Sequence, residues 1–390
     1  MQTTLQPVLI LLATAVLVVV VCRTLRLPPL LGYLIVGAAI GPHALGWISN
    51  TEEVRDLAEI GVVFLMFSIG LEFSLPKLIT MRRIVFGLGV AQVLATLVVV
   101  LAVAVVLGIK WQTGIVLGGA LAMSSTAILA KLLAERFELN SPHGRQIIGI
   151  LLFQDLAVVP LLIVIPALAA APEDLALDLG AALLKAAVVL AVLLFAGQRV
   201  MRGWFHLVAR QKSSELFVLN VLLVTLGVAF ITGIAGLSLA LGAFVAGVLI
   251  SETEFRLQVE ADIKPFRDVL LGLFFVTIGM LLDVRVVLES GWVSVMLVAL
   301  VVIKTLLISG LARLFGADPG VALRTGLALG ACGEFGFVIL ANANSAGLLG
   351  AQVLQPVLAA MVLSMLIAPF VIDRSEHIVR RWAPADWMSR

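Results

Sequence analysis

Apolar runs close to 20 residues long recur along the whole chain, separated by short charged or Gly- and Pro-rich breaks. About 20 helical residues, at about 1.5 Å each, cross a hydrocarbon core of about 30 Å. Dividing the chain at its breaks predicts about 13 membrane-spanning helices. They are expected at residues 5–22, 28–42, 54–74, 84–108, 113–134, 146–170, 179–200, 213–232, 234–251, 265–282, 288–312, 322–345 and 353–373. The pattern predicts an all-α polytopic membrane protein, with a transmembrane domain over residues 1–380 and a cytosolic tail at 381–390.

The composition agrees with a membrane protein and argues against other classes. The chain is 62% hydrophobic and 13% charged, with a mean hydropathy of +1.16, whereas about 25% charged residues is typical of a soluble domain. Cys22 and Cys332 lie in or beside apolar runs and are expected to be small core residues. The four His lie outside the predicted spans, where we expect them to be solvated, and no nucleophile and base set or metal-ligand spacing appears. We therefore expect neither an enzyme nor a nucleic-acid-binding protein, and no resident cofactor.

Positive charge predicts the orientation in the membrane. Of the 26 Lys and Arg residues, 21 fall in the loops of one side or at the span ends next to them, and only Arg55, Lys110 and Arg285 fall on the other side. Lys185 and Lys304 lie inside predicted spans. Because cytoplasmic loops carry the excess of Lys and Arg, the N-terminus is expected outside and the C-terminus in the cytoplasm.

Two parts of the chain resemble each other. The segment "LGYLIVGAAI" at 31–40 aligns with "LGAFVAGVLI" at 241–250, at an offset of 210. The segment "FSIG" at 67–70 aligns with "VTIG" at 276–279, at an offset of 209. Each match alone is weak, but both place the partner spans seven positions apart in the order of predicted helices.

The same register continues through the later spans and predicts an inverted repeat. An offset of 209 places Ser124 on Gly333, and residues 151–160 on 360–369. Since seven is odd, the second copy must run through the membrane in the opposite direction. The two copies are expected at about 28–170 and 234–373. An inverted repeat is typical of alternating-access transporters, whose site lies near the midplane at the repeat interface.

Polar residues of four segments are predicted to meet at this depth. Asp155 lies ten residues after Arg145, which places it about 15 Å into its span. Counting from the cytoplasmic charges of the other spans gives similar depths for their polar residues. The candidates are Asp155, Gln154, Ser124, Ser125, Thr126, Lys304 and Glu334. Ionisable residues inside a membrane are costly, so they are candidates for function.

Two of these spans are expected to be interrupted. "MSSTAILA" at 123–130 clusters hydroxyl groups, and "LGACGEFGFVIL" at 329–340 places three Gly around a Glu. Interruptions at matching positions of two repeats indicate a transport site, and broken helices expose backbone groups that favour ions. Close helix packing could instead explain the Gly residues, and the hydroxyls of Ser124 and Thr126 could bond their own helix.

A membrane carboxylate without a positive partner suits an antiporter. Burial away from water favours its neutral form, so either a proton or a bare cation can neutralise Asp155, but not both. Gln154 adds a carbonyl ligand and no charge, which predicts exchange of one proton for one monovalent cation held at Asp155. Lys304 is expected to form a supporting ion pair with Glu334 or Asp155, whereas Glu72 is expected at the cytoplasmic boundary, outside the site.

Other classes of transport protein stay open at this point. A ligand-gated cation channel could line a pore with the same polar groups, although channel filters are usually shared between subunits. A symporter for an organic anion would suit a neutral pocket better. Potassium and sodium cannot be told apart, because selectivity depends on cavity size and ligand number.

Several segments together resemble the membrane domain of Kef-type potassium/proton antiporters, in the monovalent cation/proton antiporter superfamily. The resemblance covers nearly the whole chain and rests on "LPPLLGYLIVGAAIGP", "EIGVVFLMFSIGLEFSL", "MSSTAI", "LLFQDLAVVPLL", "DIKPFRDVLLGLFFVTIGM" and "GEFGFV". It implies the sodium/proton antiporter fold with two crossed, interrupted helices, an elevator-type movement, a homodimer and potassium as substrate. It also implies a bacterial inner membrane location, and Gln154 and Asp155 match the Kef Gln-Asp pair.

The resemblance also implies regulation, with one departure. Residues 251–266 resemble the Kef regulatory loop, whose acidic residues restrain transport; an ordinary solvated loop is the alternative. The corresponding acids are Glu252, Glu254, Glu260 and Asp262. Kef proteins continue into a cytosolic nucleotide-binding domain gated by glutathione adducts, and no glycine-rich segment of that kind follows the last span here. A separate regulatory domain or subunit is therefore a possible partner.

Overall fold

The computed structural model describes residues 2–25, 29–48, 52–73, 75–169, 175–283, 285 and 291–382. All regular secondary structure within these ranges is helical, which confirms the all-α prediction. The predicted span limits at 28, 74, 170 and 288 and most of the predicted tail, residues 383–390, lie outside the described residues.

Each predicted span corresponds to one helix or to two consecutive helices. The first half contains α1 (Gln2–Thr24), α2 (Pro29–Ile40), α3 (Glu52–Glu72), α4 (Leu75–Thr80), the π-helix η1 (Ile84–Gly89), α5 (Val90–Val106), α6 (Trp111–Ala122), α7 (Thr126–Glu135) and α8 (Pro142–Ala167). The second half contains α9 (Leu175–Ala209), α10 (Ser214–Ile234), α11 (Leu239–Ser251), α12 (Arg256–Leu281), α14 (Gly291–Leu314), α15 (Pro319–Leu329), α16 (Glu334–Ser345) and α17 (Ala351–Trp382).

By length and composition, six described helices can cross a membrane, or seven if α15 and α16 form one bent span. The chain is therefore a multi-pass membrane protein. The remaining predicted spans are shorter helices, such as α2, or helices that carry more charge, such as α12. The number of 13 spans stays a prediction.

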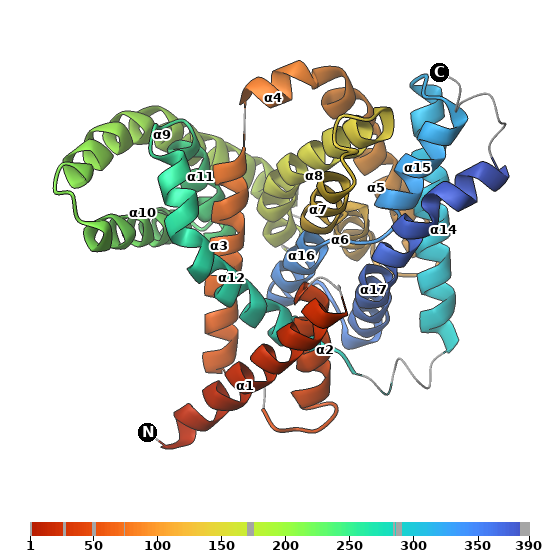
Figure 1. Ribbon diagram of the computed structural model, residues 1–390, viewed down its shortest axis with the longest axis horizontal. Helices are drawn as coiled ribbons and strands as arrows, with labels where there is room; N and C mark the ends of the chain where they lie inside the picture. Colours follow the sequence, from red (N-terminus) through yellow and green to blue (C-terminus); the bar gives the residue numbers. More distant parts are fainter. Residues whose placement is uncertain are drawn as a thin grey trace.

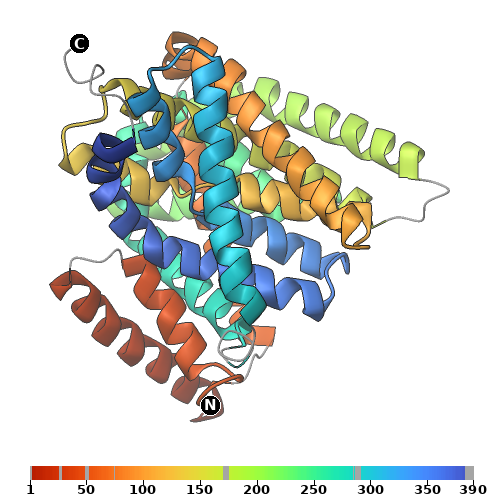
Figure 2. The same cartoon turned by 90° about the vertical axis from the view of Figure 1, so that its right-hand side faces the viewer.

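The helices form two groups (Figure 1). We call α1, α2, α3, α9, α10, α11 and α12 the scaffold group; its largest packing interfaces join α3 to α11 and α12, and α2 to α12. We call α5 to α8 and α14 to α17 the core group, in which α5 packs on α6, α14 on α15, and α16 on both α6 and α8. Figure 2 shows α14 (cyan) running across the outside of the core group.

Glycine contacts in the scaffold group support the inverted repeat. The sequence offsets pair Gly37 with Gly247, and Gly70 with Gly279. A Cβ atom on Gly37 of α2 would lie 2.9 Å from the Cα of Gly279 on α12, and one on Gly247 of α11 would lie 2.9 Å from the carbonyl carbon of Gly70 on α3. Thus α2 packs on α12, the counterpart of α3, and α11, the counterpart of α2, packs on α3. A two-fold relation between the two copies requires such a pair of matching contacts.

Candidate functional site

The first predicted interruption is present at residues 123–125. α6 ends at Ala122 and α7 begins at Thr126. The side chain of Ser125 accepts a hydrogen bond of 3.3 Å from the backbone N–H of Ile128 and caps the new helix. Serine is a preferred N-cap because its oxygen satisfies an N–H that has no partner within the helix.

The second predicted interruption lies between α15, which ends at Leu329, and α16, which begins at Glu334. The two helices are bent by 45°. A Cβ atom on Gly333 would lie 2.3 Å from the carbonyl carbon of Ser124, so only glycine lets the two breaks cross in direct contact. The Gly cluster therefore serves both the interruption and close packing, the two explanations that the sequence left open.

Ser124 connects the crossing helices instead of bonding its own helix. Its Oγ donates to the carbonyl oxygen of Leu329 at 2.9 Å, and its backbone N–H donates to Oε1 of Gln154 at 2.7 Å. Ser124 and Gln154 are both buried. The break of repeat one is thereby tied to α15 of repeat two and to α8.

The ammonium group of Lys304 lies against the ends of both broken helices. Its Nζ donates to the carbonyl oxygen of Met123 at 2.8 Å, to Oγ of Ser124 at 2.9 Å and to the carbonyl oxygen of Ala331 at 3.1 Å. The C-terminal end of a helix carries a partial negative charge, so one buried cation neutralises the ends of α6 and α15 together.

These contacts give Lys304 partners that the sequence did not suggest. Helix-end oxygens and a hydroxyl accept from its three N–H donors, and the predicted ion pair with Glu334 or Asp155 stays a prediction. The sequence marked Lys304 as a candidate, but two of its three partners are backbone oxygens, which no side-chain pattern reveals.

Asp155 and Gln154 point to different neighbours, because successive helical residues are about 100° apart. Oδ1 of Asp155 accepts a hydrogen bond of 3.2 Å from Oγ1 of Thr126, the first residue of α7. Gln154 is fully buried, and its Nε2 donates to Oε1 of Gln92 on α5 at 2.8 Å. Within the described part of the chain, no Lys or Arg forms an ion pair with Asp155.

Two further acids surround Asp155. Glu334 is buried in the first turn of α16, where the partial positive charge of the helix end favours a carboxylate. Glu334 and Glu72 are both close enough to act electrostatically on Asp155. Glu72 ends α3 in the scaffold group and lies 3.9 Å from Nη1 of Arg267 on α12, so it is closer to the site than its position at the end of a span suggested.

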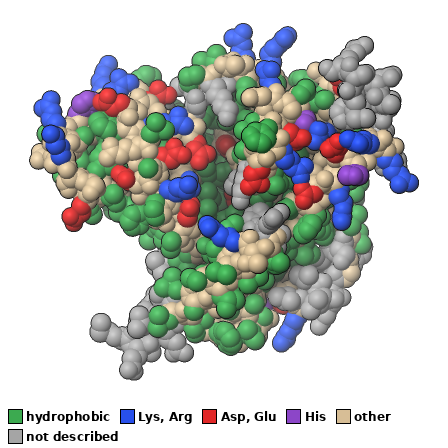
Figure 3. Space-filling view, viewed as in Figure 1, with side chains coloured by type: hydrophobic (Ala, Val, Ile, Leu, Met, Phe, Trp, Pro, Cys, Tyr) green, Lys and Arg blue, Asp and Glu red, His purple; other side chains and the backbone are tan. Residues whose placement is uncertain are grey.

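Figure 3 shows a hollow near the middle of one face of the molecule. Acidic side chains lie on both of its sides, and Lys and Arg side chains also lie near it.

The segment compared with a regulatory loop is largely helical. α12 begins at Arg256, not at residue 265, so Glu260 and Asp262 lie on this helix, because its buried Val259 and Ile263 continue an apolar face. Only residues 252–255 form a turn between α11 and α12, and Glu252 and Glu254 are exposed there. The carboxylate of Glu254 lies 2.9 Å from Nε2 of His206 on α9.

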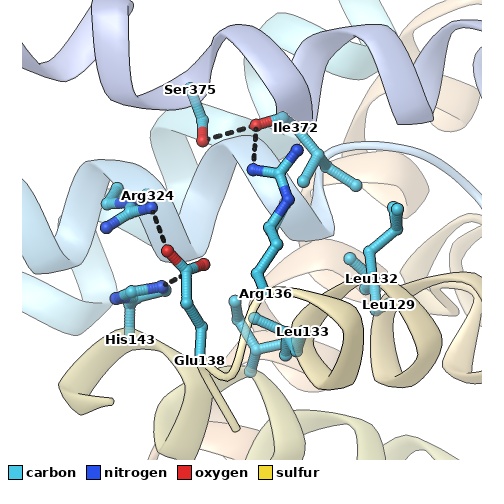
Figure 4. A pocket seen from close by; sticks show the side chains of 11 residues that line it. Leu129, Leu132, Leu133, Arg136, Glu138, His143, Arg324, Ile372 and Ser375 are labelled. Atoms are coloured by element: carbon cyan, nitrogen blue, oxygen red, sulfur yellow. Dashed lines mark hydrogen bonds and ion pairs between the residues drawn. The ribbon is translucent and has the colours of Figure 1, made fainter.

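A charged cluster that the sequence did not predict lies at the other end of α7 (Figure 4). Glu138 accepts a hydrogen bond of 2.9 Å from Nη2 of Arg324 on α15, and lies 3.2 Å from Nε2 of His143. Arg136 reaches the carbonyl oxygen of Ile372 and the carboxylate of Asp373 on α17. The cluster links the α7–α8 connection to the C-terminal helices.

Two features of this cluster follow from its surroundings. Partial burial would raise the pKa of Glu138, but the hydrogen bond and charge of His143 and the charge of Arg324 outweigh it and hold that pKa below its usual value. His143 is buried, which corrects the expectation of a solvated loop residue, because α8 begins at Pro142. The pair Ser141-Pro142, an N-cap followed by Pro at N1, was the signal for this earlier start.

Several known proteins are similar to this chain. Residues 10–374 match the family model described as "Sodium/hydrogen exchanger, transmembrane". A putative K(+) efflux antiporter KefB from Alkalimonas amylolytica is 42% identical over 385 residues, which cover 97% of this chain and 58% of that protein. K(+) efflux antiporter 1, chloroplastic, from Arabidopsis thaliana is 43% identical over 363 residues, which cover 91% of this chain and 30% of that protein. The chain thus spans about half, or less, of the length of these relatives.

A solved structure supports the fold. The sodium proton antiporter MjNhaP1 from Methanocaldococcus jannaschii, at pH 8, matches with a TM-score of 0.65 and 17% sequence identity, over 97% of this chain and 100% of that one. At this identity the match concerns the fold, which confirms the predicted antiporter fold class, and the matched family and relatives confirm the resemblance to Kef-type proteins in the monovalent cation/proton antiporter superfamily.

Proposed function

Because the chain belongs to the sodium/hydrogen exchanger family, we propose that it is a secondary antiporter that exchanges potassium for protons in a ratio of one to one. Asp155 is the group that the two ions share. The proposal rests above all on one observation: Asp155 lies beside the crossed helix breaks, and none of the described Lys or Arg residues forms an ion pair with it.

The proposed cycle follows from charge. An empty, ionised Asp155 is costly to move through the membrane, whereas a proton or a potassium ion neutralises it. The hydroxyl of Thr126 contacts Asp155 and can offer an oxygen ligand to the cation. Ser124, Ser125 and Gln154 shape the break next to it. We assign Glu334 a constant charge, held by the N-terminus of α16, so that each cycle moves one positive charge in each direction.

Potassium is chosen over sodium because the relatives with 42% and 43% identity are named K(+) efflux antiporters. A sodium/proton antiporter is the alternative. A ligand-gated cation channel fits less well, because the two breaks seal directly against each other and Lys304 places a fixed positive charge between them.

Further proposals concern the setting of the transporter. We propose a homodimer in the bacterial inner membrane, with the N-terminus outside, in which the core group moves against the scaffold group as an elevator. The acidic positions Glu252, Glu254, Glu260 and Asp262 are proposed to restrain transport, together with a cytosolic regulatory domain or subunit.

The test uses the full chain in proteoliposomes that contain a pH-sensitive dye. Adding potassium should move protons across the membrane, with no change when the membrane potential is clamped, and Asp155→Asn should abolish this flux. The matched control is Asp318→Asn, the same chemical change at an exposed residue before α15, which should transport like the wild type. Flux that persists in Asp155→Asn, or a current without counter-transport, would overturn the proposal. The same assay with sodium in place of potassium tests the alternative function, a sodium/proton antiporter.

A further inference from the structure

Gln92 is a fully buried polar residue on α5, a helix whose other buried positions are Val93, Thr96 and Ala104. Its Nε2 donates to the carbonyl oxygen of Ala122 at 3.1 Å and to Oγ1 of Thr96 at 3.2 Å. Its Oε1 accepts from Nε2 of Gln154. One side chain therefore joins the last residue of α6 to α8.

The contact with Ala122 has a counterpart in repeat two. The sequence offset of 209 that pairs Ser124 with Gly333 also pairs Ala122 with Ala331. The carbonyl oxygen of Ala331 accepts from Lys304 on α14, as that of Ala122 accepts from Gln92 on α5. Each repeat thus supplies a donor to the end of its own broken helix. The donor to Ala331 is a charged ammonium, and the donor to Ala122 is a neutral amide.

The neutral donor also fixes Gln154. The amide of Gln154 is held at both ends, by Gln92 at 2.8 Å and by the backbone N–H of Ser124 at 2.7 Å. The side-chain oxygen of Gln154 therefore faces the helix break at residues 123–125, and its side-chain nitrogen faces α5. Ser124 lies two residues before Thr126, whose hydroxyl contacts Asp155.

We propose that Gln92 is a positioning residue of the cation and proton site. It orients the Gln154 amide and holds the end of α6, and through both it keeps the Thr126 hydroxyl against Asp155. Gln154 then acts mainly by holding the break, with Asp155 and Thr126 as the groups that face the cation. This inference rests on the proposed function of Asp155.

The first test replaces Gln92 by Met, which has a similar length and no hydrogen-bonding amide. In the proteoliposome assay, Gln92→Met should raise the KM for potassium about tenfold, because buried partners lose their hydrogen bonds, and should lower the maximal rate by less than about threefold. Thr225→Val is the matched control: it removes a buried hydroxyl that bonds only to its own helix α10 and should leave KM unchanged.

A double-mutant cycle shows whether Gln92 acts through Gln154. Gln154→Met should raise KM by itself, and adding Gln92→Met should then raise it by less than Gln92→Met does in the wild type, because only the contacts with Ala122 and Thr96 are left to lose. Additive effects, an unchanged KM in Gln92→Met, or an equal change in Thr225→Val would overturn the inference. If Gln92→Met does not fold, Gln92→Asn replaces it, because the shorter amide cannot reach Ala122 and Gln154 together.

The same assay separates this inference from the proposed function. If Asp155→Asn still exchanges potassium for protons, the proposed function fails whatever Gln92 does. If Asp155→Asn is inactive but Gln92→Met has the KM of the wild type, only the positioning role fails.

Discussion

The two helix breaks have the same architecture and different chemistry. Lys304 binds both breaks, at Met123 and Ser124 in repeat one and at Ala331 in repeat two. The break of repeat one is also bound by the neutral amides of Gln92 and Gln154, and the break of repeat two by the hydroxyl of Ser364. The offset of 209 pairs Asp155 with Ser364, so the carboxylate lies in the repeat whose break is also bound by two neutral amides.

In the proposed mechanism, this arrangement lets one fold hold a fixed charge on Lys304 and an exchangeable charge on Asp155. The ammonium of Lys304 binds the partially negative ends of α6 and α15. It is therefore not the partner of Asp155 in this mechanism. A direct ion pair between them would have neutralised the carboxylate permanently and left nothing for a proton or cation to neutralise.

The largest expected effect is on Lys304. Lys304→Met leaves helix-end oxygens buried without donors, and should lower the free energy of unfolding by roughly 3 kcal/mol and abolish exchange. Lys304→Gln keeps amide donors without the charge. The melting temperature in detergent and the potassium-driven proton flux measure both. If Lys304→Gln matches the wild type in both, the charge on the group that joins the two breaks has no role.

A smaller effect is expected at Ser364 on α17. Its Oγ accepts from the backbone N–H of Cys332 at 3.1 Å and donates to the carbonyl oxygen of Met361. Ser364→Ala should cost about 1 kcal/mol of stability, since a buried N–H loses its partner, while the KM for potassium stays unchanged. Ser375 on the same helix bonds only to the carbonyl oxygen of Ile372, so Ser375→Ala should leave the melting temperature near that of the wild type. A raised KM in Ser364→Ala would mean that the second break also shapes the cation site.

The smallest effect is expected at Glu138, where the two repeats are tied by side-chain charges near the surface. The pKa of Glu138 is held below its usual value of 4.5. Its stabilising contribution is therefore fully present above pH 4.5 and is lost as the pH falls through the lower value in the folded protein. Glu138→Gln should cost less than about 1 kcal/mol at pH 7, and the difference from the wild type should shrink at lower pH.

Melting temperatures of both proteins between pH 7 and about pH 3 measure this dependence, because the contribution is lost only below pH 4.5. Glu376→Gln removes an exposed ion pair with Arg380 on α17 and should have no measurable effect at either pH. A difference for Glu138→Gln that is constant with pH would show that its charge does not contribute.

The sequence determined much of this protein by composition and pattern alone. Long apolar runs require helices, because backbone groups in hydrocarbon must be satisfied within the segment. The hydroxyl cluster at 124–126 and the Gly cluster around Glu334 marked both breaks, and counting along the spans put Asp155 and Lys304 at one depth. These features are local, so a single sequence displays them.

Only the tertiary structure decided which groups meet. Lys304 contacts backbone oxygens of Met123 and Ala331, Gln92 locks Gln154, and Glu138 joins Arg324. These contacts link segments far apart along the chain, and several of the partners are backbone carbonyls that every residue possesses. A carbonyl becomes a specific partner only where a helix ends and leaves it without its own N–H donor, and the crossing of the two broken helices creates that condition.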